Sequence, residues 1–588
     1  MRRLSVVFVV LMSAGIVGSA QNSWGSTSTP TITSFTPTSG RVGTTVTITG
    51  TNLTGGNVVD FGTTATASQS ALATRVTVAV PFGATTGYIR VITQAGTAKS
   101  STEFSVKPTP SLIGVSHITS DTDGFCAVLT SGGVDCWGYG DQGELGNGTM
   151  DRSGTPVPVK GLGATGTLAG VKKLASDAHD FCALLTSGAV DCWGLNQWGE
   201  LGDGSSTPSL VPVAVEGVGG TGVLSGVTSL TGGTGSFCAV LTTGGVDCWG
   251  SDVTGVQGQI FESSSTPIPV LGVSGTGVLK RVKNVTSSGG GFCALRESDT
   301  VDCWGGGGGG ALGNGNFLSE IAPVPVVGTG GTGVLSGVNA VVSSSGGYCA
   351  VLASGNVDCW GNGTYGELGN GVFYTTGNYG SAVPVAVEGI GGAGTLSGVK
   401  SVTDNSSSNT YCALLSSGEL ACWGLGYHGE LGDGTFYTTG SNGSAVPVAV
   451  VSGDGSGTLS GVKAVVDGGS GYNPCALLTS GGVDCWGYGA DGELGNGTYY
   501  TSGNEGSAVP VAVISVGGTA PLVGVRIIGS GAPDDLSGVA NSNCVILTST
   551  KVDCWGYGSY GQLGNGHLYF GSPPYGSATP QKAVAVGT

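Results

Sequence analysis

Sixteen cysteines fall into eight pairs, and nine residues separate the two partners of every pair. Between the partners, an apolar stretch leads into a turn rich in serine and glycine, and a second apolar stretch begins after it. Residues 126–136 show this pattern, which is typical of a β-hairpin. The fixed spacing therefore predicts the same hairpin eight times. The pairs are Cys126 with Cys136, Cys182 with Cys192, Cys238 with Cys248, Cys293 with Cys303, Cys349 with Cys359, Cys412 with Cys422, Cys475 with Cys485, and Cys544 with Cys554.

The pairs are expected to form disulfides. With an odd number of residues in the turn region, the two cysteines lie directly opposite each other, where Cα atoms about 4.5 Å apart are within reach of a disulfide. Closing so short a loop removes roughly 2–3 kcal/mol of unfolded-chain entropy in the chain-entropy model. Zinc sites prefer cysteines about two to four residues apart and often use histidine, and the chain has four histidines. Reduced thiols and metal binding are the alternatives, and we predict no metal site.

Each hairpin ends in Trp-Gly, and an element such as Gly-Glu-Leu-Gly-Asn-Gly (143–148) and a Pro-Val strand usually follow. The repeat period is 55 or 56 residues at first and 63 to 69 residues later. The 116 glycines therefore belong to a turn-rich repeat. Several short strands per unit, apolar on both faces, favour propeller blades, although a solenoid would also bury both faces.

The units resemble the regulator of chromosome condensation repeat. The match is seen in Cys-Ala-Leu-Leu (182–185), Trp-Gly (193–194) and Gly-Glu-Leu-Gly (199–202), and it recurs over roughly residues 111–588. The resemblance implies an all-β fold, a β-propeller that normally has seven blades. Eight hairpins favour eight blades here, with seven as the alternative. The fragments that begin at Ser111 and end near Val584 would together complete one blade and close the ring.

The region before the repeats has a different organisation. Residues 1–20 have a short basic start, an apolar stretch and a small-residue cleavage site, which predicts a secretory signal peptide, and residues 21–28 form a linker. Residues 29–107 contain alternating strands such as 75–80 and are similar to the IPT/TIG immunoglobulin-like domain, a β-sandwich without catalytic residues. Residues 108–588 then form the propeller.

Charge and motif content exclude several functions. The net charge is −17, and no cluster of lysine and arginine exists, so nucleic acid is not an expected partner. The histidines are scattered, and none belongs to a catalytic or metal-binding signature. The short acidic turn 121–124 has the composition of a calcium loop, but such turns are common by chance. We predict no catalytic residues, no enzyme activity, no cofactor and no membrane insertion after signal cleavage.

The last four units carry a longer loop with paired aromatic residues after the Leu-Gly-(Asn/Asp)-Gly element. Equivalent positions in successive blades lie on one face of a ring, so we predict a binding surface there. The competing interpretation is that the aromatic side chains pack on each other. The residues are Phe373, Tyr374, Phe436, Tyr437, Tyr499, Tyr500, Tyr569 and Phe570.

Three classes of function compete. The favoured one is a secreted or cell-surface, monomeric binding or adhesion scaffold for an extracellular protein or a surface glycan. The second is a guanine-nucleotide exchange regulator, which the resemblance to the repeat family implies. The third is a propeller-type inhibitor of an extracellular enzyme. The signal peptide and the disulfides argue against the exchange factor, because an exported protein does not meet a nuclear GTPase.

Overall fold

A computed structural model describes residues 28–56, 58–81, 83–251, 263–289, 291–403, 409–467, 472–529, 541–569 and 573–585. The chain divides into two compact units, Met1–Pro108 and Thr109–Thr588. The predicted signal peptide and residues 21–27 of the linker lie outside the described residues. Within the described part, no helix has the length and apolar character that a membrane span requires.

The first unit consists of two facing sheets, with strand orders β1-β3-β7-β6 and β2-β9-β8-β4-β5. Buried and accessible residues alternate along β3, so one face of each sheet supplies the core. Phe61 and Phe104 meet edge to face there, with ring centroids 5.1 Å apart. The strands are β1 (Thr31–Thr36), β2 (Ser39–Gly40), β3 (Thr45–Thr51), β4 (Val58–Phe61), β5 (Thr64–Ala67), β6 (Ser70–Leu72), β7 (Arg75–Ala79), β8 (Gly87–Thr93) and β9 (Gly96–Val106).

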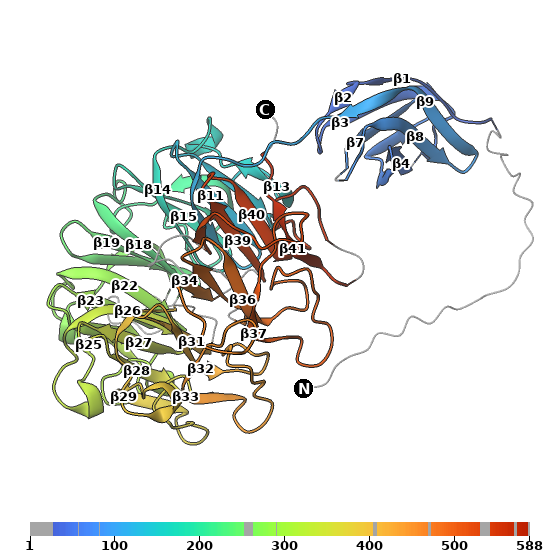
Figure 1. Ribbon diagram of the computed structural model, residues 1–588. Helices are drawn as coiled ribbons and strands as arrows, with labels where there is room; N and C mark the ends of the chain where they lie inside the picture. Colours follow the sequence, from blue (N-terminus) through green and yellow to red (C-terminus); the bar gives the residue numbers. More distant parts are fainter. Residues whose placement is uncertain are drawn as a thin grey trace, which may run out of the picture. The chain divides into compact units, whose positions relative to one another are not determined.

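The described residues of the second unit form eight antiparallel four-stranded sheets, each built from four consecutive strands, A to D (Figure 1). These sheets are blades 1 to 8, which gives the propeller one more blade than the usual seven. Strands A are β10 (Val115–Ser120), β14 (Val171–Ser176), β18 (Val227–Gly233), β22 (Val282–Ser288), β26 (Val338–Ser344), β30 (Val399–Val402), β34 (Val462–Asp467) and β38 (Val525–Ile528). Strands B are β11 (Gly124–Leu129), β15 (Asp180–Leu185), β19 (Ser236–Leu241), β23 (Gly291–Arg296), β27 (Gly347–Leu352), β31 (Thr410–Leu415), β35 (Pro474–Leu478) and β39 (Ser542–Leu547).

The remaining strands complete each blade. Strands C are β12 (Val134–Gly138), β16 (Val190–Gly194), β20 (Val246–Gly250), β24 (Val301–Gly305), β28 (Val357–Asn362), β32 (Leu420–Leu425), β36 (Val483–Tyr488) and β40 (Val552–Tyr557). Strands D are β13 (Ser153–Pro158), β17 (Ser209–Ala214), β21 (Ser264–Pro269), β25 (Glu320–Pro325), β29 (Gly380–Ala386), β33 (Gly443–Ala449), β37 (Gly506–Ala512) and β41 (Gly576–Lys582). Short 3₁₀ turns are η1 (Leu162–Ala164), η2 (Val273–Gly275), η3 (Gly308–Gly310), η4 (Thr329–Gly331) and η5 (Ile390–Gly392).

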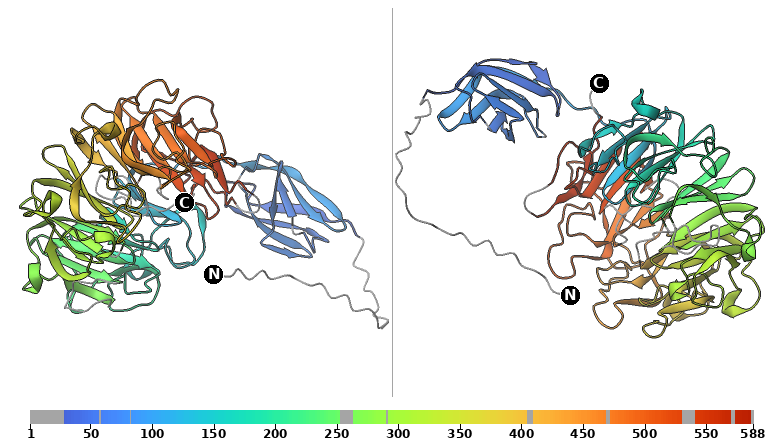
Figure 2. Two further views of the ribbon diagram at one scale, coloured as in Figure 1. Left: turned by 90° about the horizontal axis from the view of Figure 1, so that it is seen from below. Right: turned by 180° about the vertical axis from the view of Figure 1, so that it is seen from behind.

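The first and last blades meet and close the ring. Figures 1 and 2 show blade 1 beside blade 8, and Cys544 and Cys554 of blade 8 share a hydrophobic core with Trp137 of blade 1. The two ends of the repeat region also pair directly, because Ser111 and Val584 form an antiparallel bridge. The predicted meeting of the two ends is therefore present in the structure. The prediction that the end fragments together complete one blade is wrong, because each sheet consists of four consecutive strands.

Among the described residues, a buried tryptophan bonds seven of the blades to the preceding blade. Trp193 of blade 2 is fully buried, and its indole N–H donates to the backbone carbonyl of Glu144 in blade 1 at 2.8 Å. The same bond recurs around the ring, including across the closure, where Trp137 donates to the carbonyl of Gln562 at 2.7 Å. The Trp-Gly and Gly-Glu-Leu-Gly elements of the repeat are thus two halves of one contact between neighbouring blades.

Every cysteine pair forms a disulfide across strands B and C of its own blade. In blade 2, Cys182 and Cys192 are direct cross-strand partners with Cα atoms 4.1 Å apart. Their side chains lie in the core between blades 2 and 3, against Phe237 and Trp249 of blade 3. The disulfide therefore ties the hairpin and fills the space between two blades.

The other seven disulfides have the same Cα separation and join the partners that the spacing predicts. The described residues contain no free cysteine. The alternatives of reduced thiols and of metal-bound cysteines therefore do not apply to this structure. The seven bonds join Cys126 to Cys136, Cys238 to Cys248, Cys293 to Cys303, Cys349 to Cys359, Cys412 to Cys422, Cys475 to Cys485, and Cys544 to Cys554.

Candidate functional site

The loops between strands A and B and between strands C and D leave each blade at the same end, because adjacent strands are antiparallel. We call this end the A–B/C–D face. The short B–C turns and the connections from strand D to the next blade lie at the opposite end. Both sets of candidate residues described below belong to the A–B/C–D face.

The A–B/C–D face is hollowed over blades 2, 3 and 4. The cavity has a volume of about 500 Å³. Blade 2 contributes Asp177, Asp180, Trp198 and Glu200 to its lining, and the next two blades contribute small and hydroxyl-bearing side chains such as Ser287. Trp198 is half exposed. The cavity therefore combines an accessible aromatic ring with a group of carboxylates.

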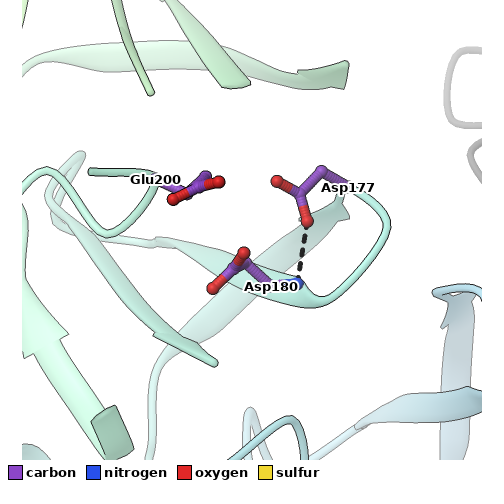
Figure 3. Close-up of side chains that lie close together, drawn as sticks. All are labelled: Asp177, Asp180 and Glu200. Carbon is purple, nitrogen blue, oxygen red and sulfur yellow. Dashed lines mark hydrogen bonds between the residues drawn. The ribbon is translucent and has the colours of Figure 1, made fainter. Parts of the chain in front are cut away.

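Asp177, Asp180 and Glu200 face one another in this cavity (Figure 3), and one oxygen from each lies within 4.8 Å of the others. Their exposed fractions are only 6%, 1% and 3%. Oδ1 of Asp177 accepts hydrogen bonds from the backbone N–H groups of His179 at 2.9 Å and Asp180 at 2.8 Å. Oδ2 of Asp177 is buried and has no hydrogen-bond partner. Figure 3 shows that the other oxygen of Asp177 points toward Glu200.

Backbone donors also fix the other two carboxylates. Oδ1 of Asp180 accepts a hydrogen bond from the N–H of Asn196 at 2.9 Å, and Oε2 of Glu200 accepts one from the N–H of Trp198 at 2.6 Å. Asn196 itself has φ of 54°, a conformation that asparagine tolerates better than most residues. The C–D loop therefore folds back so that Glu200 meets the A–B loop, although the two lie about twenty positions apart in the sequence.

Burial dominates the electrostatics of the cluster. The pKa of Asp177 is raised to about 8, mainly by burial, and the nearby charge of Glu200 acts in the same direction. Burial also raises the pKa of Asp180 well above its ordinary value, with Asp177 as the next cause. The pKa of Glu200 is raised by burial as well. Three buried carboxylates at this separation cannot all stay ionised without a compensating positive charge, so the cluster takes up either protons or a cation.

The other repeats show which carboxylate is unusual. Glu200 has buried counterparts in four other blades, namely Glu144, Glu367, Glu430 and Glu493. Asp180, two positions before the first cysteine, has none, because its counterparts are Gly124, Ser236, Gly291, Gly347, Thr410, Asn473 and Ser542. The glutamate therefore belongs to the common plan of the blade, and Asp180 is an addition in blade 2. Sequence reasoning missed this group, and comparison of the eight repeats position by position would have found Asp180.

The structure divides the seven predicted aromatic residues that it describes into two groups. Four of them are tyrosines that fasten the C–D loops. The ring of Tyr437 packs on the core between blades 6 and 7, and its hydroxyl donates to Asp433 at 2.8 Å. A Cβ atom on Gly426 would come within 2.7 Å of this ring, so the position requires glycine. Tyr374, Tyr500 and Tyr569 pack in the same way. Their hydroxyls accept hydrogen bonds from the side-chain amides of Asn370, Asn496 and Asn565.

The residue that precedes each fastened tyrosine is exposed in three blades, although the hydroxyl of Tyr499 donates to the carbonyl of Gly576 at 3.0 Å. Phe373, Phe436 and Tyr499 are each 38% exposed. The same repeat position holds two further exposed side chains, Phe317 in blade 4 at 38% and Met150 in blade 1 at 57%. We call these five residues the apolar rim. Phe317 and Met150 were not predicted because no tyrosine follows them. Phe570, the last of the predicted residues, lies outside the described residues.

Comparison with known proteins agrees with both units of the chain. Residues 30–106 match the family model of the IPT/TIG domain. The chain is 31% identical over 315 residues to the E3 ubiquitin-protein ligase HERC2 of Homo sapiens, a match that covers 53% of this chain but only 6% of that protein. It is 28% identical over 353 residues to the mitochondrial RCC1 domain-containing protein RUG3 of Arabidopsis thaliana, covering 57% of this chain and 72% of RUG3.

Among solved structures, Prp20p from Saccharomyces cerevisiae aligns with a TM-score of 0.45 and 18% identity, over 68% of this chain and 86% of that chain. The fold and the repeats together define an eight-bladed β-propeller protein with a disulfide in every blade. Its repeats are of the regulator of chromosome condensation type, and an IPT/TIG domain precedes them. The resemblance found in the sequence is confirmed for both units.

Proposed function

We propose that this protein is an exported, monomeric and non-catalytic scaffold that binds a protein or a surface glycan through the apolar rim. The observation that carries the proposal is the repetition of one exposed apolar position in five blades, at Met150, Phe317, Phe373, Phe436 and Tyr499. Large apolar side chains on a surface are the usual anchors of protein interfaces. A propeller of this type offers a rigid platform for them.

The fastened tyrosines make the rim suitable for binding. In blades 5 to 7 the residue after each rim side chain is held in the core, as Tyr437 is beside Phe436. The backbone of the loop is further tied to the next blade, because the N–H of Gly434 donates to the carbonyl of Ala508 at 2.9 Å. Anchors on preordered loops lose little conformational entropy on binding, which favours affinity.

A binding titration with two variants tests the rim. Labelled protein is titrated onto intact cells of the producing strain, and the dissociation constant is compared with those of Phe436→Ala and Val334→Ala. Val334 is a matched control, because it is an exposed apolar residue on the connection from strand D, at the opposite end of the blades. We expect Phe436→Ala to weaken binding about tenfold or more, and Val334→Ala to leave it unchanged. Wild-type affinity in Phe436→Ala would refute the role of the rim.

Export is tested separately by the intact mass of the protein after alkylation without reduction. Eight disulfides suit an oxidising compartment, and residues 1–20 have the pattern of a signal peptide. We expect a mass that lacks the signal peptide and sixteen cysteines that resist alkylation. An uncleaved chain with alkylated cysteines would place the protein in a reducing compartment and remove the basis for an extracellular partner.

A further inference from the structure

We propose that Asp177, Asp180 and Glu200 bind a calcium ion in the cavity over blades 2 to 4. The three side chains present one oxygen each within 4.8 Å of the others, and all three are buried. Calcium takes oxygen ligands at about 2.3–2.6 Å, so a single ion bridges oxygens up to about 5 Å apart. One ion can therefore contact all three carboxylates in the arrangement that the backbone already fixes. This site is separate from the apolar rim.

The buried Oδ2 of Asp177 independently points to a positively charged occupant. This atom has no hydrogen-bond partner, and Figure 3 shows an oxygen of Asp177 aimed at Glu200 in the centre of the cluster. A buried carboxylate oxygen without a partner is costly. No lysine or arginine lines the cavity among the residues that the structure describes, and none of the ion pairs formed there includes these three carboxylates.

The repeats provide an internal comparison. Blade 1 has Asp121 and Glu144 at the positions of Asp177 and Glu200, but Gly124 replaces Asp180. The blade fold is therefore complete without the third carboxylate. The cavity of about 500 Å³ leaves room for waters, which complete the six to eight oxygen ligands that calcium requires. Magnesium needs a tighter octahedral shell at about 2.0–2.1 Å, so it should bind less well.

The test uses the full chain with its disulfides formed, freed of metal by a chelator and desalted. Calcium chloride is titrated by isothermal calorimetry at pH 7.5, and thermal unfolding is followed with and without calcium. We expect one calcium ion per chain, a rise of the unfolding temperature with calcium, and weaker binding of magnesium. The absence of binding heat and of a thermal shift at millimolar calcium would overturn the proposal and would mean that protons neutralise the cluster.

Three variants locate the site. Asp180→Asn and Glu200→Gln should each weaken calcium binding at least tenfold. Both variants should keep the blade intact, because blade 7 has Asn473 at the position of Asp180 and blade 8 has Gln562 at the position of Glu200. Oε1 of Gln562 accepts the N–H of Tyr560 at 3.0 Å, which is the bond that Glu200 makes with Trp198. Glu430→Gln changes the same element in blade 6 and should bind calcium as the wild type does. Wild-type affinity in both Asp180→Asn and Glu200→Gln would show that calcium binds elsewhere and refute the site.

Discussion

Glu430 gives the clearest prediction for stability, because it is a buried acid with only one of its oxygens satisfied. Its side chain is fully buried, and Oε2 accepts the N–H of His428 at 2.8 Å, while Oε1 has no hydrogen-bond partner. Burial raises the pKa of Glu430 to about 7. The folded protein therefore keeps this proton over a pH range in which the unfolded chain has already lost it.

The sign and the size of the effect follow from proton linkage. From about pH 4.5, the ordinary value for glutamate, to about pH 7, the folded state binds more protons than the unfolded state. Stability therefore falls as the pH rises through this window and levels off above it. With about 1.4 kcal/mol for each tenfold change in the proton equilibrium, the ionised Glu430 costs on the order of 3 kcal/mol at pH 8.

The variant Glu430→Gln removes this titration and keeps the hydrogen bond to the loop, as Gln562 does in blade 8. Calorimetric unfolding in chelator should give similar midpoints for the variant and the wild type at pH 5. At pH 8 the variant should unfold a few degrees higher, because it never carries the buried charge. The reasoning would be refuted if the unfolding midpoints of variant and wild type differed by the same amount at both pH values. It would also be refuted if the variant unfolded at a lower temperature than the wild type at pH 8.

Three further predictions concern the contacts that hold the blades. Trp193→Phe leaves the buried carbonyl of Glu144 without its donor, so it should cost about 1–3 kcal/mol, seen as a lower thermal midpoint. The double replacement of Cys182→Ala with Cys192→Ala should cost roughly 2–3 kcal/mol, measured against the oxidised wild type by chemical denaturation. Tyr437→Phe removes the hydrogen bond to Asp433 and should lower the free energy of unfolding by about 1 kcal/mol. The loop that Tyr437 holds should then be cleaved faster by a protease than in the wild type.

The parts of the fold that depend on local sequence could be predicted. The hairpin between Cys182 and Cys192 lies within eleven consecutive residues, so the turn and the strand pattern already place the two cysteines opposite each other. Closure of the ring involves the opposite ends of the repeat region, Ser111 and Val584. The sequence predicted that these ends meet but wrongly predicted a blade shared between them, because the repeat alone does not show at which strand a blade begins. The count of eight blades follows from the hairpins.

The aromatic loops show where local reasoning stops. Phe436 and Tyr437 are adjacent and both aromatic, so the sequence does not tell which of them is exposed. The difference depends on Asp433, which accepts the tyrosine hydroxyl, and on Gly426, which leaves space for its ring. Only the three-dimensional path of the loop brings these residues together. The prediction that these loops form a binding surface stays a prediction, and four of the eight residues named for it pack against the blade cores instead.

The carboxylate cluster suggests how a site can be recognised in a repeat protein. The repeat plan places Glu200 in the blade for structural reasons, because its side-chain Oε2 accepts the backbone N–H of Trp198 at 2.6 Å and so fixes the loop. A site then needs only a few departures from the plan beside such a residue, here an acidic residue at Asp177 and another at Asp180. Seven other blades show that the fold does not require the second of these. The added charge is costly when buried, and calcium is the occupant that would offset this cost.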